Sequence, residues 1–439
     1  MPRSNRLSRR RFIRQTAAVA AGGVAAPCVV PRHVLAAEDS PGANDRIGIG
    51  YIGVGRRGGQ LMGLPGEAQV IAATDINKSR AEATAARFKG KPFTDYRKML
   101  EMKEIDAVII ASPDHWRALH CVHACQAGKD IYAEKPLTLT IKEGRAIADA
   151  AKKYKIVFQT GSQQRSMSAN RLACELVRNG RLGKIHTVIG SNYPSPWLMN
   201  LPGQDVPAGL DWDAWCGQAP LVPYNIDLYT PRRNPGWISV WPYSGGEMTG
   251  WGAHGLDQIQ WALGADEGGP LEVWCEDGPY KMPTFNEPVG RGTGNGIFSN
   301  KYKVFYRYPG DVIVKLDNGS QAGGIFIGDK GKIEIHRGKF VCNPPELAKE
   351  PIKDSEIHLY ESNNHMGNWF DCMKTRKDPI CSAEIGHRSC TVCHLGNIAR
   401  WLGRKLKWDP AREIFPGDEE ANKFLDTEKR KGYELPSPV

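Results

Sequence analysis

Residues 47–58 read IGIGYIGVGRRG, and this stretch decides the fold of the first part of the chain. An apolar run predicts a buried strand, and Gly53, Gly55 and Gly58 follow it with the spacing G-x-G-x-x-G. In this pattern the first glycine permits a tight turn, the second lets backbone approach a pyrophosphate, and the third lets a helix pack on its strand. The helix N-terminus offers free N–H groups to the phosphates. The stretch therefore predicts a dinucleotide site.

A second apolar run, residues 70–74, ends at Asp75 and supports this interpretation. A carboxylate at this distance from the glycines accepts hydrogen bonds from the ribose hydroxyls of the adenosine half, and it repels a 2′-phosphate. Asp75 therefore favours NAD as the cofactor. Arg56 and Arg57 soften that repulsion, which leaves NADP as the alternative.

The first 37 residues predict an export signal. Residues 8–14 read SRRRFIR, which matches the twin-arginine pattern, and an apolar run and small-residue cleavage sites follow. The segment holds seven arginines and no acid, so it accounts for seven of the ten excess positive charges of the chain. The remainder lacks the basic character of a nucleic-acid-binding protein and has no stretch apolar enough to span a bilayer. We expect a periplasmic product without a membrane anchor.

Two different patterns of secondary structure follow the signal. Strand and helix patterns alternate up to about residue 161, which predicts an α/β fold with a doubly wound parallel sheet. Strand patterns joined by tight turns then dominate, which predicts an α+β domain with a large, mostly antiparallel open sheet. The loop-rich segment 194–248 is long enough to indicate a function. We therefore expect a signal peptide (1–37), a Rossmann domain (38–161) and a C-terminal substrate and oligomerisation domain (162–439).

The cysteines show no disulfide-framework spacing. Ten of the eleven follow the signal, and the twin-arginine route exports chains that have already folded in a reducing cytoplasm, so we expect buried thiols. Cys390-Thr391-Val392-Cys393-His394 matches the pattern of c-type haem attachment. Haem is attached to unfolded chains outside the cytoplasm, so we expect two cysteines packed on a helix over residues 384–406. We predict no metal site.

Two polar motifs lie where predicted strands end. Residues 112–115 read SPDH after the strand 106–111, and residues 134–136 read EKP after the strand 130–133. Ligands of open α/β sheets bind outside the carboxyl ends of the strands. Both motifs are therefore expected beside the dinucleotide crevice.

Together these motifs resemble the glucose–fructose oxidoreductase, inositol dehydrogenase and MocA family, from about residue 46 to the end of the chain. The resemblance implies an N-terminal Rossmann domain and a C-terminal α/β domain whose open sheet supports a homodimer or homotetramer. It also implies that Lys135 lies beside the nicotinamide and the reacting hydroxyl. The residues that we expect to contact the cofactor are Gly53, Gly55, Arg56, Arg57, Gly58, Asp75, Ser112, Pro113, His115, Glu134 and Gln163.

The second family motif falls at residues 245–257, GGEMTGWGAHGLD. In the family, the histidine that matches His254 bonds the substrate hydroxyl and takes its proton. Hydride leaves a carbinol carbon readily only as the O–H proton is removed. A histidine of near-neutral pKa suits that task when a lysine cation stabilises the developing alkoxide. His254 and Lys135 are therefore the expected catalytic pair.

This chain departs from the family pattern at one position. The family usually has an aspartate four residues before the histidine, where this chain has Gly250. Three alternatives follow: Lys135 and His254 suffice, another acid substitutes, or hydride transfer has a changed role. Asp257 and Glu247 are the nearby acids, and we include Asp257 among the catalytic candidates.

Aromatic side chains are dense between residues 192 and 251. Flat aromatic faces suit the C–H faces of sugar rings, although we expect at least half of these rings to pack in the core. Basic side chains nearby can hold hydroxyls or carboxylates. The residues that we expect to contact the substrate are Arg165, Tyr193, Arg232 and Trp251.

These features predict an exported nicotinamide-dependent oxidoreductase that acts on a hydroxyl of a sugar or sugar derivative. Free NAD is scarce outside the cytoplasm, so we expect a tightly bound cofactor that is recycled. One form of cycle oxidises one sugar and reduces another. Another oxidises a sugar hydroxyl transiently, eliminates the glycosidic substituent, adds water and reduces the ring again, as in family members that resemble α-N-acetylgalactosaminidases. A non-catalytic sugar or nucleotide sensor is the third hypothesis; Gly250 favours it, and the presence of Lys135 and His254 opposes it.

Overall fold

The computed structural model describes residues 46–233, 236–287 and 297–437. The twin-arginine segment and its expected cleavage sites lie outside the described residues. The helices and strands all belong to one compact unit, Ile47–Val439. None of the helices within the described ranges is long and apolar enough to cross a membrane.

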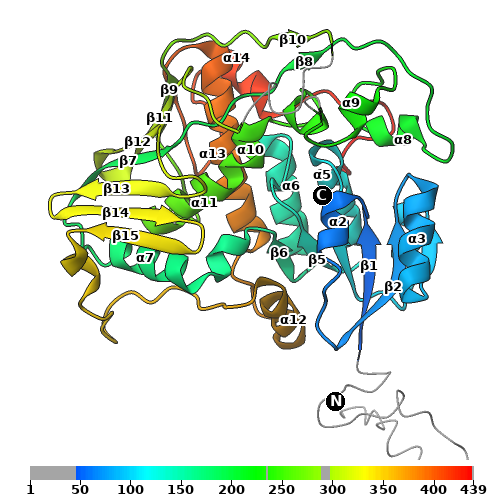
Figure 1. Cartoon of the computed structure of the whole chain (residues 1–439), viewed down its shortest axis with the longest axis horizontal. Coiled ribbons are helices and arrows are strands. Elements are labelled where there is room, and N and C mark those ends of the chain that lie inside the picture. Colours follow the sequence, from blue (N-terminus) through cyan, green and yellow to red (C-terminus); the bar gives the residue numbers. More distant parts are fainter. Residues whose placement is uncertain (1–45, 234–235, 288–296, 438–439) are drawn as a thin grey trace, which may run out of the picture. The chain divides into compact units, whose positions relative to one another are not determined.

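A six-stranded parallel sheet forms the first half of this unit, with the strand order β3-β2-β1-β4-β5-β6 (Figure 1). All four residues of β4 are buried and apolar, as expected for a parallel strand covered on both faces. The strands are Ile47–Ile52 (β1), Ala68–Thr74 (β2), Lys91–Phe93 (β3), Ala107–Ile110 (β4), Asp130–Ala133 (β5) and Phe158–Thr160 (β6). The helices are Arg56–Gln60 (α2), Lys78–Phe88 (α3), Tyr96–Leu100 (α4), Asp114–Gln126 (α5) and Ile141–Lys153 (α6). The predicted doubly wound sheet is confirmed.

An eight-stranded sheet forms the second half, with the order β15-β14-β13-β7-β12-β11-β9-β16. Its pairs are antiparallel except β7 with β12, which confirms the predicted mostly antiparallel sheet. The strands are Ile185–Ser191 (β7), Glu272–Cys275 (β9), Val304–Tyr308 (β11), Val312–Asp317 (β12), Gly324–Gly328 (β13), Gly331–His336 (β14), Lys339–Asn343 (β15) and Leu406–Lys407 (β16). A separate parallel pair joins Leu198–Met199 (β8) to Thr284–Phe285 (β10).

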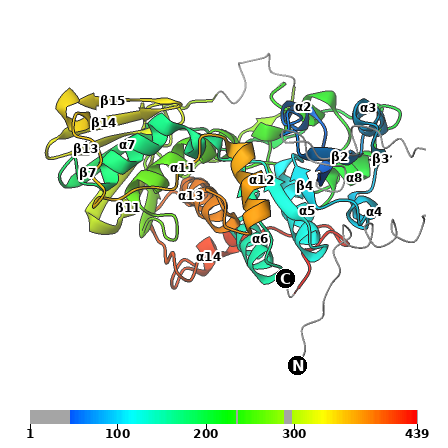
Figure 2. The ribbon, with the colours of Figure 1, turned by 90° about the horizontal axis from the view of Figure 1, so that it is seen from below.

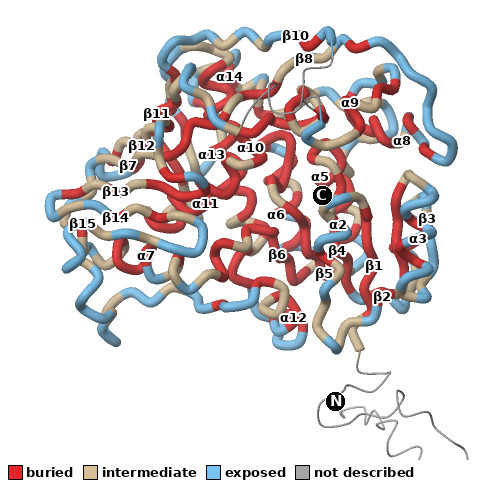
Figure 3. The backbone as a smooth tube through the Cα atoms, in the orientation of Figure 1, coloured by how far each residue is buried: buried red, intermediate tan, exposed pale blue. Residues whose placement is uncertain are grey.

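Helices cover one face of the second sheet. Along β12, Val312, Val314 and Leu316 are buried and the intervening residues are partly exposed, because side chains alternate between the two faces of a strand. The buried face packs against Ser168–Arg178 (α7), Gly252–Leu263 (α11) and Ala383–Leu402 (α13). Figure 2 shows these helices beside the sheet, and Figure 3 shows α11 and α13 buried along most of their length.

The C-terminal half also completes the core of the Rossmann domain. Trp369 and Phe370 of His365–Thr375 (α12), a helix that the sequence did not reveal to us, pack with side chains of β1. Cys390 of α13 packs with α5 and α6. Residue 161, the expected boundary, lies between the last strand of the first sheet and the first strand of the second. The hydrophobic core of the Rossmann domain nevertheless includes side chains from the C-terminal half.

The bounds of three helices have local causes. α5 begins at Asp114, where Pro113 lacks an N–H and an acidic side chain favours the first turn. The helix expected over 384–406 ends at Leu402, because Gly403 adopts the left-handed conformation at φ 63°. The tail after α13 forms the short helix Glu419–Asn422 (α14) and a 3₁₀ turn, and beyond them Lys429 pairs with Glu143 of α6 at 2.5 Å.

The ten cysteines within the described residues are all free, and nine are buried, which confirms the expected buried thiols. Cys390 and Cys393 pack inside α13, as expected, and the Cys390 Sγ lies 3.3 Å from His394 Nε2. Across the described part of the chain, no group of three or more His, Cys, Asp or Glu side chains could hold a metal ion.

Candidate active site

The glycine loop after β1 is shaped by close backbone contacts. Gly53 adopts φ +83°, and a Cβ there would lie 2.9 Å from the Ser112 nitrogen. A Cβ on Gly58 would lie 2.3 Å from the Gly53 carbonyl oxygen, so α2 packs directly on the turn. Gly55 differs, because among the described residues, its two chain neighbours aside, the one atom within 4 Å of its Cβ position is Arg80 Nη1 at 3.6 Å. The loop therefore leaves open space at the glycine that the motif places against a pyrophosphate.

Asp75 lies at the end of β2, where its carboxylate is fixed by backbone. One oxygen accepts from Val54 N at 3.0 Å and the other from Asn77 N at 2.9 Å. Burial raises the pKa of Asp75. The Arg80 guanidinium lies near this carboxylate and over the Tyr229 ring, 5.1 Å from its centre. The adenosine end of the site thus combines an acid with a neighbouring arginine.

Part of the long segment 194–248 folds over this end of the Rossmann sheet. Its backbone bonds the loop after β2, since Lys78 N donates to Gly209 O at 2.9 Å and Asp211 N donates to Ile76 O at 3.2 Å. The short helices Trp212–Cys216 (α8) and Ile226–Tyr229 (α9) carry an aromatic cluster. The rings that pack together are Trp212, Trp215, Tyr224, Tyr229 and Tyr243. As expected for about half of the aromatics, these form a core of their own.

His115 connects α5 to this cluster. It is fully buried, with Nε2 2.8 Å from Trp215 O and Nδ1 3.3 Å from Tyr243 O. Burial lowers its pKa to about 4, so the ring is neutral at neutral pH. Ser112 Oγ, one turn earlier, lies 2.9 Å from His120 Nδ1. Through these contacts the SPDH motif holds α5 against the aromatic cluster.

Glu134 and Lys135 follow β5 at its carboxyl end. Glu134 is buried and pairs with Arg57 of α2 at 2.7 Å, which joins the EKP motif to the glycine loop. Lys135 Nζ donates to the Gly250 carbonyl at 3.1 Å, which joins the EKP motif to the second family motif. Burial lowers the pKa of Lys135, and the Glu134 carboxylate opposes that effect.

His254 is buried on α11, near Lys135. Its Nδ1 is buried and has no hydrogen-bond partner among the described residues. Burial lowers the pKa of His254 well below its usual value, and the cations Lys135, Arg337, Arg57 and Arg232 lower it further. The imidazole is therefore neutral at neutral pH and can accept a proton. The Trp251 ring lies beside it, with 5.7 Å between ring centres.

Gly250 ends the short helix Glu247–Gly250 (α10). The side chain of Glu247 occupies the space beside this glycine. A Cβ at position 250 would lie 2.8 Å from Glu247 Oε2. Arg232 grips this carboxylate through two hydrogen bonds of 2.7 and 2.8 Å. Arg232 itself has φ 52°, a left-handed conformation that costs a non-glycine residue about 1–2 kcal/mol and that clusters at functional sites.

Three expected site residues have other partners in the structure. Arg165 is 1% exposed and pairs with Asp257 at 2.8 Å and Asp266 at 2.7 Å. Asp257 is equally buried and also accepts from Ser389 Oγ. Tyr193 lies in the core of the second half, where its hydroxyl accepts from Ala322 N. These contacts occupy the polar groups of the three side chains, and the expected substrate roles of Arg165 and Tyr193 and the expected catalytic role of Asp257 stay predictions.

Three further residues expected at the cofactor are Pro113, Arg56 and Gln163. Pro113 is the N-cap of α5 and Arg56 is exposed on α2. Gln163, on the 3₁₀ turn after β6, accepts from Arg337 at 3.5 Å. Arg337 lies in the turn between β14 and β15, and its approach to His254 could not be predicted from the sequence, because that hairpin lies 83 residues from His254.

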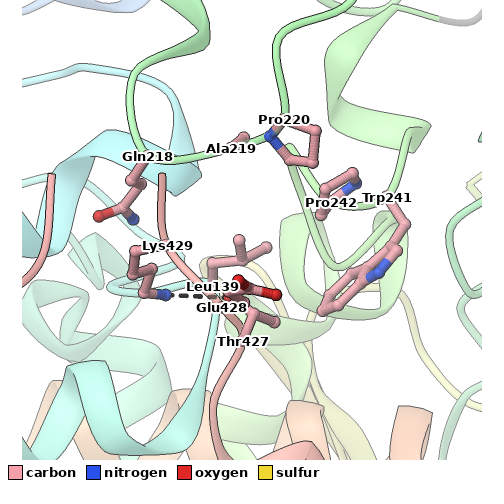
Figure 4. A pocket seen from close by; sticks show the side chains of 9 residues that line it. All are labelled: Leu139, Gln218, Ala219, Pro220, Trp241, Pro242, Thr427, Glu428 and Lys429. Atoms are coloured by element: carbon pink, nitrogen blue, oxygen red, sulfur yellow. Dashed lines mark hydrogen bonds between the residues drawn. The ribbon is translucent and has the colours of Figure 1, made fainter. Parts of the chain in front are cut away.

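A cavity of about 190 Å³ lies away from these residues (Figure 4). Trp241 and Pro242 form one side, and the C-terminal tail forms the other through Thr427 and Lys429, which bond each other at 3.0 Å. None of the expected site residues lines this cavity. It forms where the tail closes on the Rossmann domain.

Two family models match the chain. One is described as an oxidoreductase family, NAD-binding Rossmann fold, and covers residues 47–162. The other is described as an oxidoreductase family, C-terminal alpha/beta domain, and covers residues 175–435. Together they account for both sheets.

Curated relatives match over a smaller part of the chain. Scyllo-inositol 2-dehydrogenase (NAD(+)) of Bacillus subtilis strain 168 is 31% identical over 139 residues, which is 31% of this chain and 40% of that protein. A glycosyl hydrolase family 109 protein of Shewanella sp. strain W3-18-1 is 29% identical over 173 residues, which is 34% of this chain and 37% of that protein. The matched stretches thus span less than half of these relatives.

A solved structure shares the fold over a larger part. Levoglucosan dehydrogenase in complex with NADH and levoglucosan has a TM-score of 0.54 and 17% identity, over 82% of this chain and 99% of that chain. The fold, the glycine loop and the two family matches agree. The chain therefore belongs to the Gfo/Idh/MocA oxidoreductase family, with an NAD-binding Rossmann domain followed by the family's C-terminal α/β domain.

Proposed function

We propose that this protein is an exported oxidoreductase that removes hydride from a hydroxyl-bearing carbon of a sugar or sugar derivative and passes it to tightly bound NAD. The observation that carries the proposal is the convergence of the Lys135 ammonium and the neutral His254 imidazole, whose buried Nδ1 has no partner within the described residues. Scyllo-inositol 2-dehydrogenase and levoglucosan dehydrogenase, by their names, act on polyhydroxylated rings.

The residues present fit a nicotinamide dinucleotide. The backbone at Gly55 is open where a pyrophosphate would lie, and Asp75 has both oxygens fixed at the end of β2. Asp75 favours NAD, while the neighbouring Arg80 keeps NADP as the alternative. When bound, the cofactor supplies the hydride acceptor. The segment bearing α8 and α9 bonds the loop after β2, so it would cover the adenosine end of a bound cofactor and favour its tight retention.

The side chains divide the chemistry between them. The sugar hydroxyl donates its proton to the neutral His254 ring as the C–H bond breaks, and the carbon–oxygen bond becomes a carbonyl. The Lys135 ammonium stabilises the negative charge that develops on the oxygen. Glu134 holds Arg57 at the glycine loop, and the proximity of Arg232 and Trp251 to His254 supports the proposal that they contact the sugar.

The export proposal rests on the twin-arginine pattern in residues 8–14. An exported enzyme with a retained cofactor must regenerate it, so we propose a closed redox cycle. The protein purified from the periplasm should retain NAD(H) through gel filtration, and it should reduce a second sugar after oxidising the first. Recovery of apoprotein that depends wholly on added NAD would refute the retained cofactor.

A glycosidase is the second candidate, and the likeness to a glycosyl hydrolase family 109 protein favours it. Such an enzyme oxidises the sugar transiently, eliminates the substituent, adds water to the unsaturated ring and reduces the ring again, without net redox change. The two candidates differ in a single measurement. Release of the aglycone from a glycoside, in the absence of any second sugar, would identify the glycosidase.

A further inference from the structure

We propose that Glu247 is the positioning residue that keeps Lys135 charged and in place, in the space that Gly250 leaves free. This inference rests on the proposed function, in which Lys135 acts as a cation. It extends that function to a residue outside the expected catalytic pair.

The geometry around Gly250 carries the inference. Glu247 is 3% exposed, and its Oε2 lies 2.8 Å from the position of a Cβ on Gly250. Lys135 Nζ bonds the carbonyl of that same glycine at 3.1 Å. The Glu247 carboxylate and the Lys135 ammonium thus both approach Gly250, and they interact electrostatically with each other. Any larger side chain at position 250 would displace the carboxylate.

Arg232 fixes the Glu247 side chain. Its Nε and Nη2 donate to the two carboxylate oxygens at 2.7 and 2.8 Å, a planar two-bond arrangement. The Arg232 side chain is 37% exposed and the Glu247 side chain is buried, so Arg232 forms the solvent-facing side of the ion pair. A buried carboxylate held in this way has one orientation, as a positioning group requires.

The other acid considered near His254 has no such position. Asp257 is bound by Arg165 and Ser389, on the side of α11 that packs against α7 and α13. Its charge is neutralised there, and Lys135 is not among its partners. Glu247 is also paired, with Arg232, but it lies beside Gly250 and its charge acts on Lys135.

Several charged or titratable groups face Lys135. They are Glu134 beside it, Arg232, Glu247 on α10, Asp114 on α5, His254 on α11 and Cys393 on α13. Burial and the Arg232 cation lower the pKa of Lys135, whereas Glu134, Glu247 and Asp114 raise it. Loss of the Glu247 charge should therefore lower the pKa of Lys135 further. Arg232, deprived of its counter-charge, would act in the same direction.

The test is the Glu247→Gln variant of the full-length holoenzyme, which keeps the size of the side chain. If Lys135 must be charged, kcat falls as pH rises through its pKa. We expect this alkaline limb to move to lower pH by about one pH unit in the variant. NMR of isotope-labelled lysine, assigned with Lys135→Arg, should show the same shift of the Lys135 titration without any substrate.

A variant that moves the carboxylate from position 247 to position 250 distinguishes a positioning role of Glu247 from a purely structural one. In Glu247→Ala/Gly250→Asp the carboxylate is supplied from position 250 into the vacated space, and we expect the Lys135 titration and the alkaline limb to return toward those of the wild type. Gly250→Asp alone brings its Cβ within 2.8 Å of the Glu247 carboxylate and should impair activity. Glu175→Gln is the matched control, because Glu175 is a buried acid paired with Arg171 outside the site.

An unchanged Lys135 titration in Glu247→Gln would overturn the proposal, as would a double variant whose Lys135 titration stays at the shifted position. A wild-type protein that transfers no hydride from any sugar would instead overturn the proposed function. The NMR titration still decides the role of Glu247 in that case, so the two failures are distinguishable.

Discussion

Substitution of the third glycine of the loop, Gly58→Ala, should disrupt cofactor binding through backbone geometry alone. The new Cβ would lie 2.3 Å from the Gly53 carbonyl oxygen, whereas an ordinary contact is 3.4 Å or longer. The turn and α2 must therefore separate by about 1 Å, and a misplacement of that size in a functional site can cost about 10²-fold. We expect the Kd for NAD to rise by about 100-fold, or about 2.7 kcal/mol.

The same clash should reduce the stability of the apoprotein. Overpacking costs about 1–3 kcal/mol, and the gain in helix propensity from glycine to alanine returns about 1 kcal/mol. The measurements are urea unfolding of the nucleotide-free protein and calorimetric titration with NAD. In Gly58→Ala, the free energy of unfolding should fall and the Kd for NAD should rise.

Two neighbouring glycines provide matched controls. Gly59 is exposed on the same helix, and nothing lies within 4 Å of its Cβ position, so Gly59→Ala should bind NAD normally and gain a little stability. Gly55 has an ordinary φ of −68° and only Arg80 nearby, so Gly55→Ala should keep its stability and lose NAD affinity. Equal NAD affinity in Gly58→Ala and Gly59→Ala would refute the reasoning.

Further predictions concern single side chains. Lys135→Ala should lower kcat by about 10²-fold or more while NAD still binds, because the ammonium acts on the alkoxide that forms during the reaction; steady-state kinetics and NAD titration check this. Activity should fall at low pH as His254 becomes protonated, at a pH below the usual range of histidine, since burial and nearby cations lower its pKa. Arg337→Gln removes one of those cations, so the pH profile of kcat should move to higher pH, and an unmoved profile would contradict the assignment. Asp75→Ala should weaken NAD more than NADP in binding titrations, because only NAD loses a favourable ribose contact; equal losses would contradict the role of Asp75.

The local patterns of the sequence were sufficient for the elements that form the two sheets. The apolar run before Gly53 and the spacing of the glycines predict a strand, a turn and a helix. These elements can be predicted because each depends on residues that are close together in the sequence. The alternation in Val312–Asp317 likewise predicts a strand with one buried face. Lys135 and His254 were found because each lies in a motif of contiguous residues.

Only the tertiary structure decided how the polar side chains are paired. Arg165 and Asp257 lie 92 residues apart, and they pair with each other because buried charges require partners. Glu247 faces the Lys135 site because the carbonyl of Gly250 meets a lysine 115 residues earlier in the sequence. Sequence patterns report the spacing of neighbours along a helix or strand, whereas charge pairing depends on which surfaces meet after the two sheets have packed together.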